Sequence, residues 1–345
     1  MHIGILTGGG DAPGLNAVIR GVTVRASEGG HVVTGFLRGW KGLIEDEGVE
    51  LTPETVRDIH TQGGTVLLSS RTNPDRVENG YDLIKRTLKA RKIDFLIAVG
   101  GEDTLGVADR LSKDGIAVAG VPKTVDNDLG ATDYTFGFDT AVNYIMEALD
   151  RLKTTARSHE RVIVVEIMGR HAGWMALHGG IAGGAHVILI PEIEFDTDQV
   201  CGILRRRFDE GRRYALVAVA EGAMDPSLAR HVMHSAAQDS FGHVQLGTGI
   251  GIGEVLSNEI GDRTGLETRH VVLGHVQRGG CPSAFDRVLG TRLGVKAVEI
   301  AEEGRTGLMA ALRGTTVVAV PLGEAVGTLK TVPPEDYETA KLFFG

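Results

Sequence analysis

Short apolar runs rich in valine and isoleucine recur along the chain and alternate with segments of helical periodicity. Most runs are continuous, which is typical of strands that are covered on both faces by helices. The pattern predicts strands near 3–7, 31–36, 94–99, 116–121, 161–167, 185–190, 214–220, 270–273 and 316–320. It predicts amphipathic helices over 137–153, 285–303 and 14–27. This alternation indicates an α/β fold built on mostly parallel sheets.

The domain organisation is predicted from length and composition. A chain of 345 residues exceeds the usual size of a single core, so about two domains are expected. No Pro- or Ser-rich linker and no fixed-period repeat divides it. Compact junctions near 137–140, 250 and 305 are expected, so that one domain comprises 1–138 with about 251–305. The other then comprises about 139–250 with 306–345.

Composition excludes several classes of protein. The hydrophobic content of 42% and charged fraction of 23% are those of an ordinary soluble globular protein, and the net charge of -9 disfavours a nucleic-acid binder. The two cysteines, Cys201 and Cys281, are too few for a disulfide framework. No apolar run reaches the ~18 residues of a membrane helix, and no signal-like segment precedes the first strand. The expectation is a bacterial-type cytoplasmic enzyme.

A glycine turn, Gly8 to Gly10, follows the first predicted strand and precedes a helix. Open α/β sheets bind ligands at the carboxyl ends of their strands, where helix N-termini favour anions. Glycine allows the backbone to approach a phosphate, although an ordinary turn has the same appearance. The segment is not a Walker P-loop, because no GK[ST] follows, and it does not match GxGxxG.

A second turn, GGEDT at 100–104, places Glu102, Asp103 and Thr104 at the head of a predicted helix. Carboxylates at a phosphate site are unfavourable unless they hold a magnesium ion, which takes few protein ligands. Capping of the helix start explains the same residues equally well.

A third turn, PKTVDND at 122–128, brings together Lys123, Thr124, Asp126 and Asp128. Proline and two aspartates could form nothing more than a turn. The loop nevertheless supplies a possible base, a hydroxyl and a cation. A base near a hydroxyl nucleophile and a cation near the leaving phosphate are what phosphoryl transfer requires.

These three segments, with the opening one read as GGGDAPGLN, resemble the 6-phosphofructokinase family. So do RVIVVEIMGRHAG at 161–173, AEG at 220–222, ETR at 267–269 and LGHVQRGG at 273–280. The resemblance spans nearly the whole chain in order, and residues 321–345 contribute little to it. It implies the phosphofructokinase fold: two similar three-layer α/β domains, the first binding the phosphoryl donor and the second the sugar phosphate.

The resemblance also implies the roles of individual residues. Asp126 matches the base that takes the proton of the sugar 1-hydroxyl, and Thr124 and Asp128 line the same site. Positions matching fructose 6-phosphate contacts are Met168, Gly169, Arg170, Glu221, His275 and Arg278, with Arg161 and Arg269 reaching the 6-phosphate from a neighbouring subunit. Positions on the donor side are Gly10, Arg71, Gly101, Asp103, Thr104 and Lys123.

Departures from the family pattern concern the metal and the donor. Glu102 stands where the family usually has the aspartate of its magnesium site. ATP-using members have glycine at the position of Asp103 and commonly at that of Lys123, so this combination resembles the pyrophosphate-dependent branch of actinobacterial type. The basic cluster of the family's allosteric site is altered, with Arg20 retained, and no effector control is predicted.

The resulting hypothesis is a magnesium-dependent enzyme that transfers a phosphoryl group from diphosphate to fructose 6-phosphate, reversibly, in glycolysis or gluconeogenesis. It would be a homo-oligomer, dimer or tetramer, with shared active sites, and would bind neither nucleic acid nor membrane. One alternative is an ATP-dependent phosphofructokinase that tolerates Asp103. A relative of the NAD or lipid kinases would explain neither MGR nor HVQRGG. A non-catalytic sugar-phosphate-binding regulator would have no need of Asp126 beside a hydroxyl.

Overall fold

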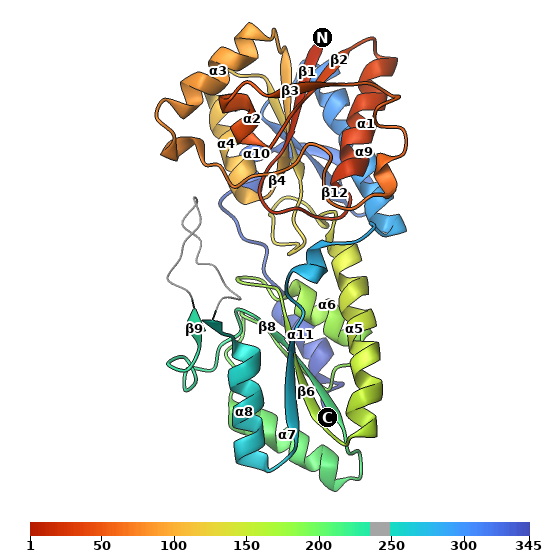
Figure 1. The fold of residues 1–345 in the computed structure, drawn as a ribbon, viewed down its shortest axis with the longest axis vertical. Coiled ribbons are helices and arrows are strands. Elements are labelled where there is room, and N and C mark those ends of the chain that lie inside the picture. Colours follow the sequence, from red (N-terminus) through yellow and green to blue (C-terminus); the bar gives the residue numbers. More distant parts are fainter. Residues whose placement is uncertain (235–248) are drawn as a thin grey trace.

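The computed structural model describes residues 1–234 and 249–345, which form two α/β bodies arranged end to end (Figure 1). The larger body is built on a seven-stranded sheet of order β13-β12-β5-β4-β1-β2-β3. Its inner strands are parallel, and the edge strands β3 and β13 are antiparallel to their neighbours. The strands are β1 (His2–Thr7), β2 (Val32–Phe36), β3 (Gly48–Leu51), β4 (Phe95–Gly100), β5 (Val118–Pro122), β12 (Leu308–Arg313) and β13 (Thr316–Pro321).

The central strands of this sheet are buried on both faces, as their continuous apolar runs predict. Successive side chains point to opposite faces. On β4, Ile97 and Val99 pack into the core shared with α1 and α9, whereas Leu96 and Ala98 pack into the core shared with α4. The helices of this body are α1 (Leu15–Glu28), α2 (Trp40–Ile44), α3 (Gly80–Ala90), α4 (Glu102–Lys113), α9 (Ala284–Glu302) and α10 (Leu322–Ala325). The larger body therefore has three layers, with the sheet between α1 and α9 on one face and α4 on the other.

The smaller body has a four-stranded, wholly parallel sheet of order β11-β6-β8-β7. Helix α5 packs against α6, β6 and β8, helix α6 also packs against β7 and β8, and α8 packs against α7, β6 and β11. These elements are β6 (Val162–Ile167), β7 (Val187–Leu189), β8 (Ala215–Ala220), β11 (Thr268–Val272), α5 (Phe138–Ser158), α6 (Trp174–Ala182), α7 (Thr197–Asp209), α8 (Ile252–Thr264) and α11 (Pro334–Lys341). The remaining short elements are β9 (Met233–His234), β10 (Gly249–Ile250), η1 (Ile59–Thr61), η2 (Pro74–Arg76) and η3 (Gly274–Arg278).

The chain crosses between the two bodies at the start of α5, between β11 and α9, and between α10 and α11 (Figure 1). The first crossing agrees with the junction expected near 137–140. The junctions expected near 250 and 305 do not match the sheets. β11, placed by the expected boundaries in the first domain, pairs with β6 of the smaller sheet, and β12, placed in the second, pairs with β5 of the larger sheet. Part of the expected range 139–250, namely 235–248, lies outside the described residues.

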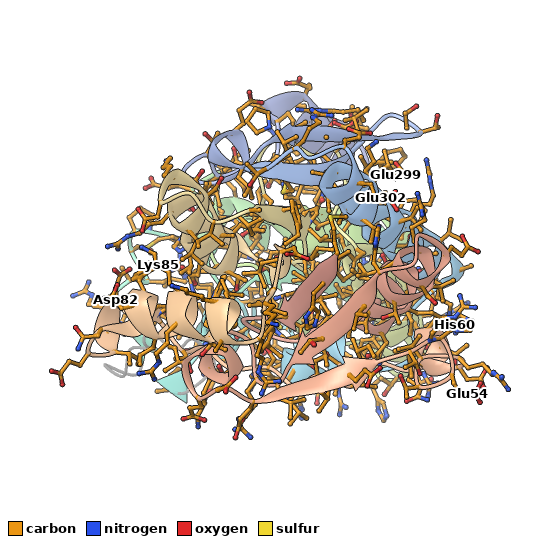
Figure 2. The ribbon with its side chains drawn as sticks, turned by 90° about the horizontal axis from the view of Figure 1, so that it is seen from above. Glu54, His60, Asp82, Lys85, Glu299 and Glu302 are labelled. Atoms are coloured by element: carbon orange, nitrogen blue, oxygen red, sulfur yellow. The ribbon has the colours of Figure 1, made fainter. Side chains whose placement is uncertain are left out.

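The predicted α/β class, the nine strands and the three helices are confirmed, with ends shifted by a few residues. Four strands were not predicted: the short strands β3, β9 and β10, and the six-residue β12. Cys201 is buried and Cys281 is exposed, and both are free thiols. Across residues 1–234 and 249–345, no helix is long and apolar enough to cross a membrane. Charged side chains such as Asp82, Lys85 and Glu299 lie at the outer edge of the larger body (Figure 2).

Candidate active site

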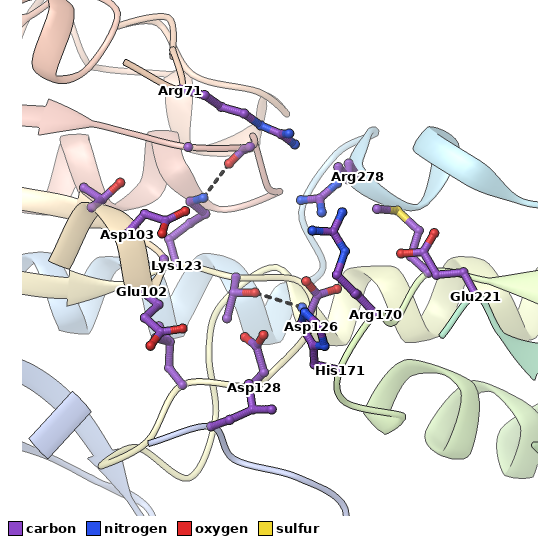
Figure 3. Close-up of a pocket in the computed structure, with 18 of the residues that line it drawn as sticks. Arg71, Glu102, Asp103, Lys123, Asp126, Asp128, Arg170, His171, Glu221 and Arg278 are labelled. Atoms are coloured by element: carbon purple, nitrogen blue, oxygen red, sulfur yellow. Dashed lines mark hydrogen bonds between the residues drawn. The ribbon is translucent and has the colours of Figure 1, made fainter. Parts of the chain in front are cut away.

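A cleft of about 550 Å³ lies where the carboxyl ends of strands from the two sheets face each other. The residues lining it follow β1, β4 and β5 of the larger sheet and β6, β8 and β11 of the smaller one. Its volume is within the range typical of small-molecule sites. Because parallel strands of one sheet end at one edge, turns far apart in the sequence converge here. Figure 3 shows the charged side chains that point into this cleft from both walls.

The glycine turn after β1 forms part of the larger-sheet wall. Gly9 and Gly10 line the cleft, and the Gly9 N–H donates to the Ser70 carbonyl at 3.0 Å, which places the loop carrying Arg71 beside the turn. A Cβ on Gly10 would lie 2.9 Å from a guanidinium nitrogen of Arg278. Glycine at this position therefore allows that arginine to approach the backbone.

Lys123 follows β5, belongs to the same wall of the cleft and is 4% exposed. Its ammonium donates to the Gly10 carbonyl (Figure 3). Burial, followed by the nearby charges of Arg278 and Arg71, lowers the pKa of Lys123 to about 8, against the opposite effect of Asp126. Three cations around one enclosed space form an anion site, since a bound polyanion would relieve their mutual repulsion.

The turn after β4 brings Gly101, Glu102, Asp103 and Thr104 into the cleft lining. Glu102 and Asp103 occupy the first turn of α4, beside the loop after β5, because β4 and β5 are parallel neighbours. Thr104 is 2% exposed, and its side chain packs between Gly8 and Gly100. Thr104 therefore contributes to the shape of the wall more than to its polar surface.

Asp126 and Asp128 lie on the loop after β5, close to both walls. The Asp126 N–H donates to the Thr124 hydroxyl at 3.1 Å, and the Asp126 Oδ1 atom is buried and accepts no hydrogen bond from the described residues. Burial and the charge of Asp126 raise the pKa of Asp128 to about 7. The pair therefore has unused capacity to accept a proton or to contact a cation.

The opposite wall follows the strands of the smaller sheet. Met168 and Arg170 line the cleft after β6, and the Gly169 N–H donates to Glu221 Oε1 at 3.4 Å. Burial and the charge of Asp126 raise the pKa of Glu221 to about 7. His275 and Arg278, on the short helix η3 after β11, complete this side. The structure thus brings the predicted sugar-phosphate residues together in one chain, with two exceptions.

Arg161 and Arg269 are the exceptions. Both guanidinium groups pair with Glu267, at 2.7 and 2.8 Å, and neither lines the cleft. Arg161 stands just before β6, whose other end leads into the cleft, so the strand separates it from Met168 by about 20 Å at 3.3 Å per residue. Within one chain these two arginines cannot contact a ligand in the cleft.

Several lining residues were not predicted. Glu166, Ile167 and His171 belong to the quoted segment at 161–173, and their place next to a strand end was the available signal. Thr328 and Leu329 come from the segment between α10 and α11, where no motif marks them.

The carboxylates of the cleft fit a hard divalent cation. No group of three or more His, Cys, Asp or Glu side chains is arranged as a complete metal cage in the part of the chain that the structure describes. Magnesium usually takes only one or two carboxylates and completes its shell with water and substrate phosphates. Glu102 and Asp128 line the cleft within electrostatic reach of each other and could serve as that pair.

A family model described as Phosphofructokinase matches residues 2–301 of this chain. The chain belongs to the phosphofructokinase family. The "Pyrophosphate--fructose 6-phosphate 1-phosphotransferase" of Amycolatopsis mediterranei is 57% identical over 347 residues, covering all of both chains. The "ATP-dependent 6-phosphofructokinase" of Corynebacterium efficiens is 49% identical, covering 100% of this chain and 99% of its own. A crystal structure of Pichia pastoris phosphofructokinase in the T-state has a TM-score of 0.82 and 33% identity, covering 94% of this chain and 35% of that one.

Proposed function

We propose that the chain transfers a phosphoryl group from diphosphate to the 1-hydroxyl of D-fructose 6-phosphate, giving fructose 1,6-bisphosphate and phosphate. The observation that carries this proposal is the position of Asp126 between the two walls of the cleft. Lys123, Arg71 and the glycine turns lie on one side, and Arg170, Glu221 and His275 lie on the other. The similarity to the phosphotransferase of Amycolatopsis mediterranei supports the choice of reaction.

In the proposed mechanism, the cleft holds diphosphate beside Lys123 and Arg71 and the sugar phosphate against Met168 and Arg170. The Asp126 carboxylate takes the proton of the 1-hydroxyl as that oxygen bonds to the nearer phosphorus. The bond from that phosphorus to the bridging oxygen breaks, and the leaving phosphate keeps the electron pair. The ammonium of Lys123 and the guanidinium of Arg71 stabilise the charge on it. The protein forms no covalent bond, so positioning supplies much of the acceleration.

Magnesium belongs to this proposal, with Glu102 and Asp128 as the protein groups that would hold it. When bound, it would neutralise part of the charge on the diphosphate. Glu102 is one methylene longer than aspartate, so it can extend further from the start of α4.

A shared active site is also part of the proposal. Arg161 and Arg269 lie away from the cleft of their own chain and side by side on Glu267. We propose that they bind the 6-phosphate in the cleft of a neighbouring copy, which makes the enzyme a homo-oligomer. The expected cytoplasmic location stays a prediction.

Diphosphate is proposed over ATP because of Asp103 and Lys123, which both line the cleft after adjacent strands. A carboxylate at 103 repels the α-phosphate of a nucleotide. At 4 Å and an effective dielectric constant of 20, two like charges cost about 4 kcal/mol, or roughly 10³-fold in affinity. Diphosphate has no further phosphate to place there, and Lys123 offers its leaving group an ammonium.

The test compares the two donors with fructose 6-phosphate and magnesium. We expect kcat/KM for diphosphate to exceed that for ATP by about 10²-fold or more. Asp103→Gly should permit ATP use and weaken diphosphate use, and Lys123→Gly should chiefly damage turnover with diphosphate. Asp109→Gly, on the same helix but outside the cleft, controls for the effect of glycine on α4. Efficient ATP turnover by the unaltered protein would replace this proposal with the ATP-dependent alternative.

A further inference from the structure

The segment between α10 and α11 packs against the loop that carries Asp126. Leu329 forms an isolated antiparallel bridge with Leu129, and the Lys330 N–H donates to the Asp128 carbonyl at 2.8 Å. The segment is also one of the crossings between the two bodies. It therefore touches the loop after β5 on the way from the larger sheet to the smaller one.

The side chain of Lys330 extends into this loop and uses all three of its N–H groups. The ammonium donates to Asn127 Oδ1 at 3.0 Å and to the carbonyls of Thr132 and Asp133 at 3.1 and 3.0 Å. A charged donor makes stronger hydrogen bonds than a neutral one. The ammonium of Lys330 thus links Asn127 to the Thr132–Asp133 part of the same loop through hydrogen bonds.

The bonds continue from Lys330 toward Asp126. Asn127 Oδ1 also accepts the Thr135 N–H at 3.1 Å, and the Thr135 hydroxyl donates to the Thr124 carbonyl at 2.8 Å. Asn127 is 3% exposed and has a positive φ of 52°, in the left-handed region that asparagine adopts more readily than most non-glycine residues. Thr124 and Asn127, which lie before and after Asp126 on the loop, are therefore both tied to the network that starts at Lys330.

Lys330 is held from the other body as well. The indole N–H of Trp174 donates to the Lys330 carbonyl at 2.8 Å, and the ammonium lies 5.5 Å from the centre of the Trp174 ring. Trp174 begins α6, immediately after the loop that brings Met168 and Arg170 into the cleft. One lysine thus contacts the loop of the proposed base and the helix behind the proposed sugar-phosphate loop.

We propose that Lys330 is a positioning residue for phosphoryl transfer, which fixes the loop carrying Asp126 relative to the wall that holds the sugar phosphate. The inference rests on the proposed function. Lys330 does not line the cleft and would touch no substrate. Its effect on the rate would come through Asp126, because a displacement of about 1 Å at a reacting group can cost roughly 10²-fold in rate.

The experiment uses Lys330→Met, which keeps most of the side-chain volume and removes the charge and the three donors. We expect kcat with diphosphate and fructose 6-phosphate to fall by about 10- to 10²-fold, and KM for fructose 6-phosphate to change by less than about threefold, since Met168, Arg170 and His275 remain. Lys296→Met is the matched control, because Lys296 is similarly shielded at 20% side-chain exposure but pairs with Glu299 on α9. It should leave kcat unchanged.

A double-mutant comparison separates positioning from general stability. If Lys330 acts through Asn127, the kcat losses of Lys330→Met and Asn127→Ala should overlap in the double variant. Additive losses, or a kcat for Lys330→Met within twofold of wild type, would overturn the inference. Should Lys330→Met fail to fold, Lys330→Gln, which keeps two donors, takes its place in the same comparison.

Amide hydrogen exchange gives a readout that needs no turnover. Lys330→Met should speed exchange at 123–135 and leave the strands of both sheets unchanged. Uniformly faster exchange would mean that Lys330 serves global stability alone. Turnover by wild type is measured first with diphosphate and with ATP, so an inactive wild type counts against the proposed function, while unchanged exchange at 123–135 counts against the role of Lys330.

Discussion

Burial in the cleft destabilises the charged form of both acidic and basic groups relative to the neutral form. The pKa of Asp128 is raised to about 7 and that of Lys123 is lowered to about 8, so burial favours the neutral form of both groups. Ligands of opposite charge would reverse both shifts. The residues of this cleft are therefore suited to bind charged ligands.

Asp126 is the residue whose loss should affect chemistry most directly. Asp126→Asn keeps the shape of the side chain and removes the base, so turnover should fall by about 10²–10⁴-fold while binding of fructose 6-phosphate is largely kept. Steady-state kinetics and a binding titration measure the two effects. Asp109→Asn, an aspartate of α4 outside the cleft, serves as control. Near-normal turnover by Asp126→Asn would remove Asp126 from the mechanism.

Lys123 should give the reaction an alkaline limit. Since burial lowers its pKa to about 8 in the free protein, the ammonium is present below that pH and is lost as pH rises above it. The neutral amine cannot stabilise an anion, so kcat/KM for diphosphate should decline above about pH 8. Lys123→Arg keeps its charge over this range and should abolish the decline. An equal decline in both proteins would assign it to another group.

Sequence patterns located most of the cleft because its residues follow strands in recognisable turns. Lys123, Asp126 and Arg170 all stand in such segments. Lys330 could not be found in this way, because its importance depends on contacts with Asn127 and Trp174, which are distant in the sequence. A single lysine in an unmarked loop carries no local pattern.

At the scale of elements, runs rich in valine and isoleucine located most of the buried strands, and strands without such a run were missed. β12, LMAALR, is rich in alanine, which has little preference for strands, and β3, GVEL, is a short edge strand. The missed β12 explains the misplaced boundary near 305, because its pairing with β5 keeps the chain in the larger sheet after α9. Pairing between segments far apart in sequence is not visible in local periodicity.

Close packing of α1 against α9 provides a test at this scale. A Cβ on Gly294 would lie 2.6 Å from the Val18 carbonyl oxygen, so the two backbones are in contact there. Gly294→Ala should destabilise the protein by roughly 1–3 kcal/mol, because the helices must separate. Gly202→Ala in α7, where a Cβ meets no atom within 4 Å, should instead stabilise it by up to about 1 kcal/mol through helix propensity. Thermal unfolding measures the stability change of each variant. A stabilised Gly294→Ala would contradict the backbone contact.

At the scale of the whole molecule, one chain supplies a cleft but keeps two of the proposed phosphate-binding arginines elsewhere. Arg161 and Arg269 share Glu267 beyond the far end of the smaller sheet. The family resemblance predicts that both arginines act in the site of a neighbouring copy.

Mixing inactive chains tests this sharing. Asp126→Asn chains and Arg161→Ala chains are each expected to be inactive, yet a mixed pair contains one site with neither lesion. Random pairing into two-fold dimers should restore about a quarter of wild-type activity. Arg161→Ala mixed with Arg269→Ala should restore none, because both arginines of any site come from one neighbour. If verified mixed assemblies of the first pair stay inactive, the shared site is wrong.

The strand order of the larger sheet has a consequence for synthesis on the ribosome. β5 lies inside the finished sheet, yet its neighbour β12 comes from a distant part of the chain, and the Val118 N–H donates to Thr306, 188 positions later. A nascent chain that has completed β5 therefore exposes an unpaired, apolar strand edge while all four strands of the smaller sheet are being translated. Such edges favour aggregation. We expect nascent chains of this protein to depend on chaperone protection until β12 has emerged.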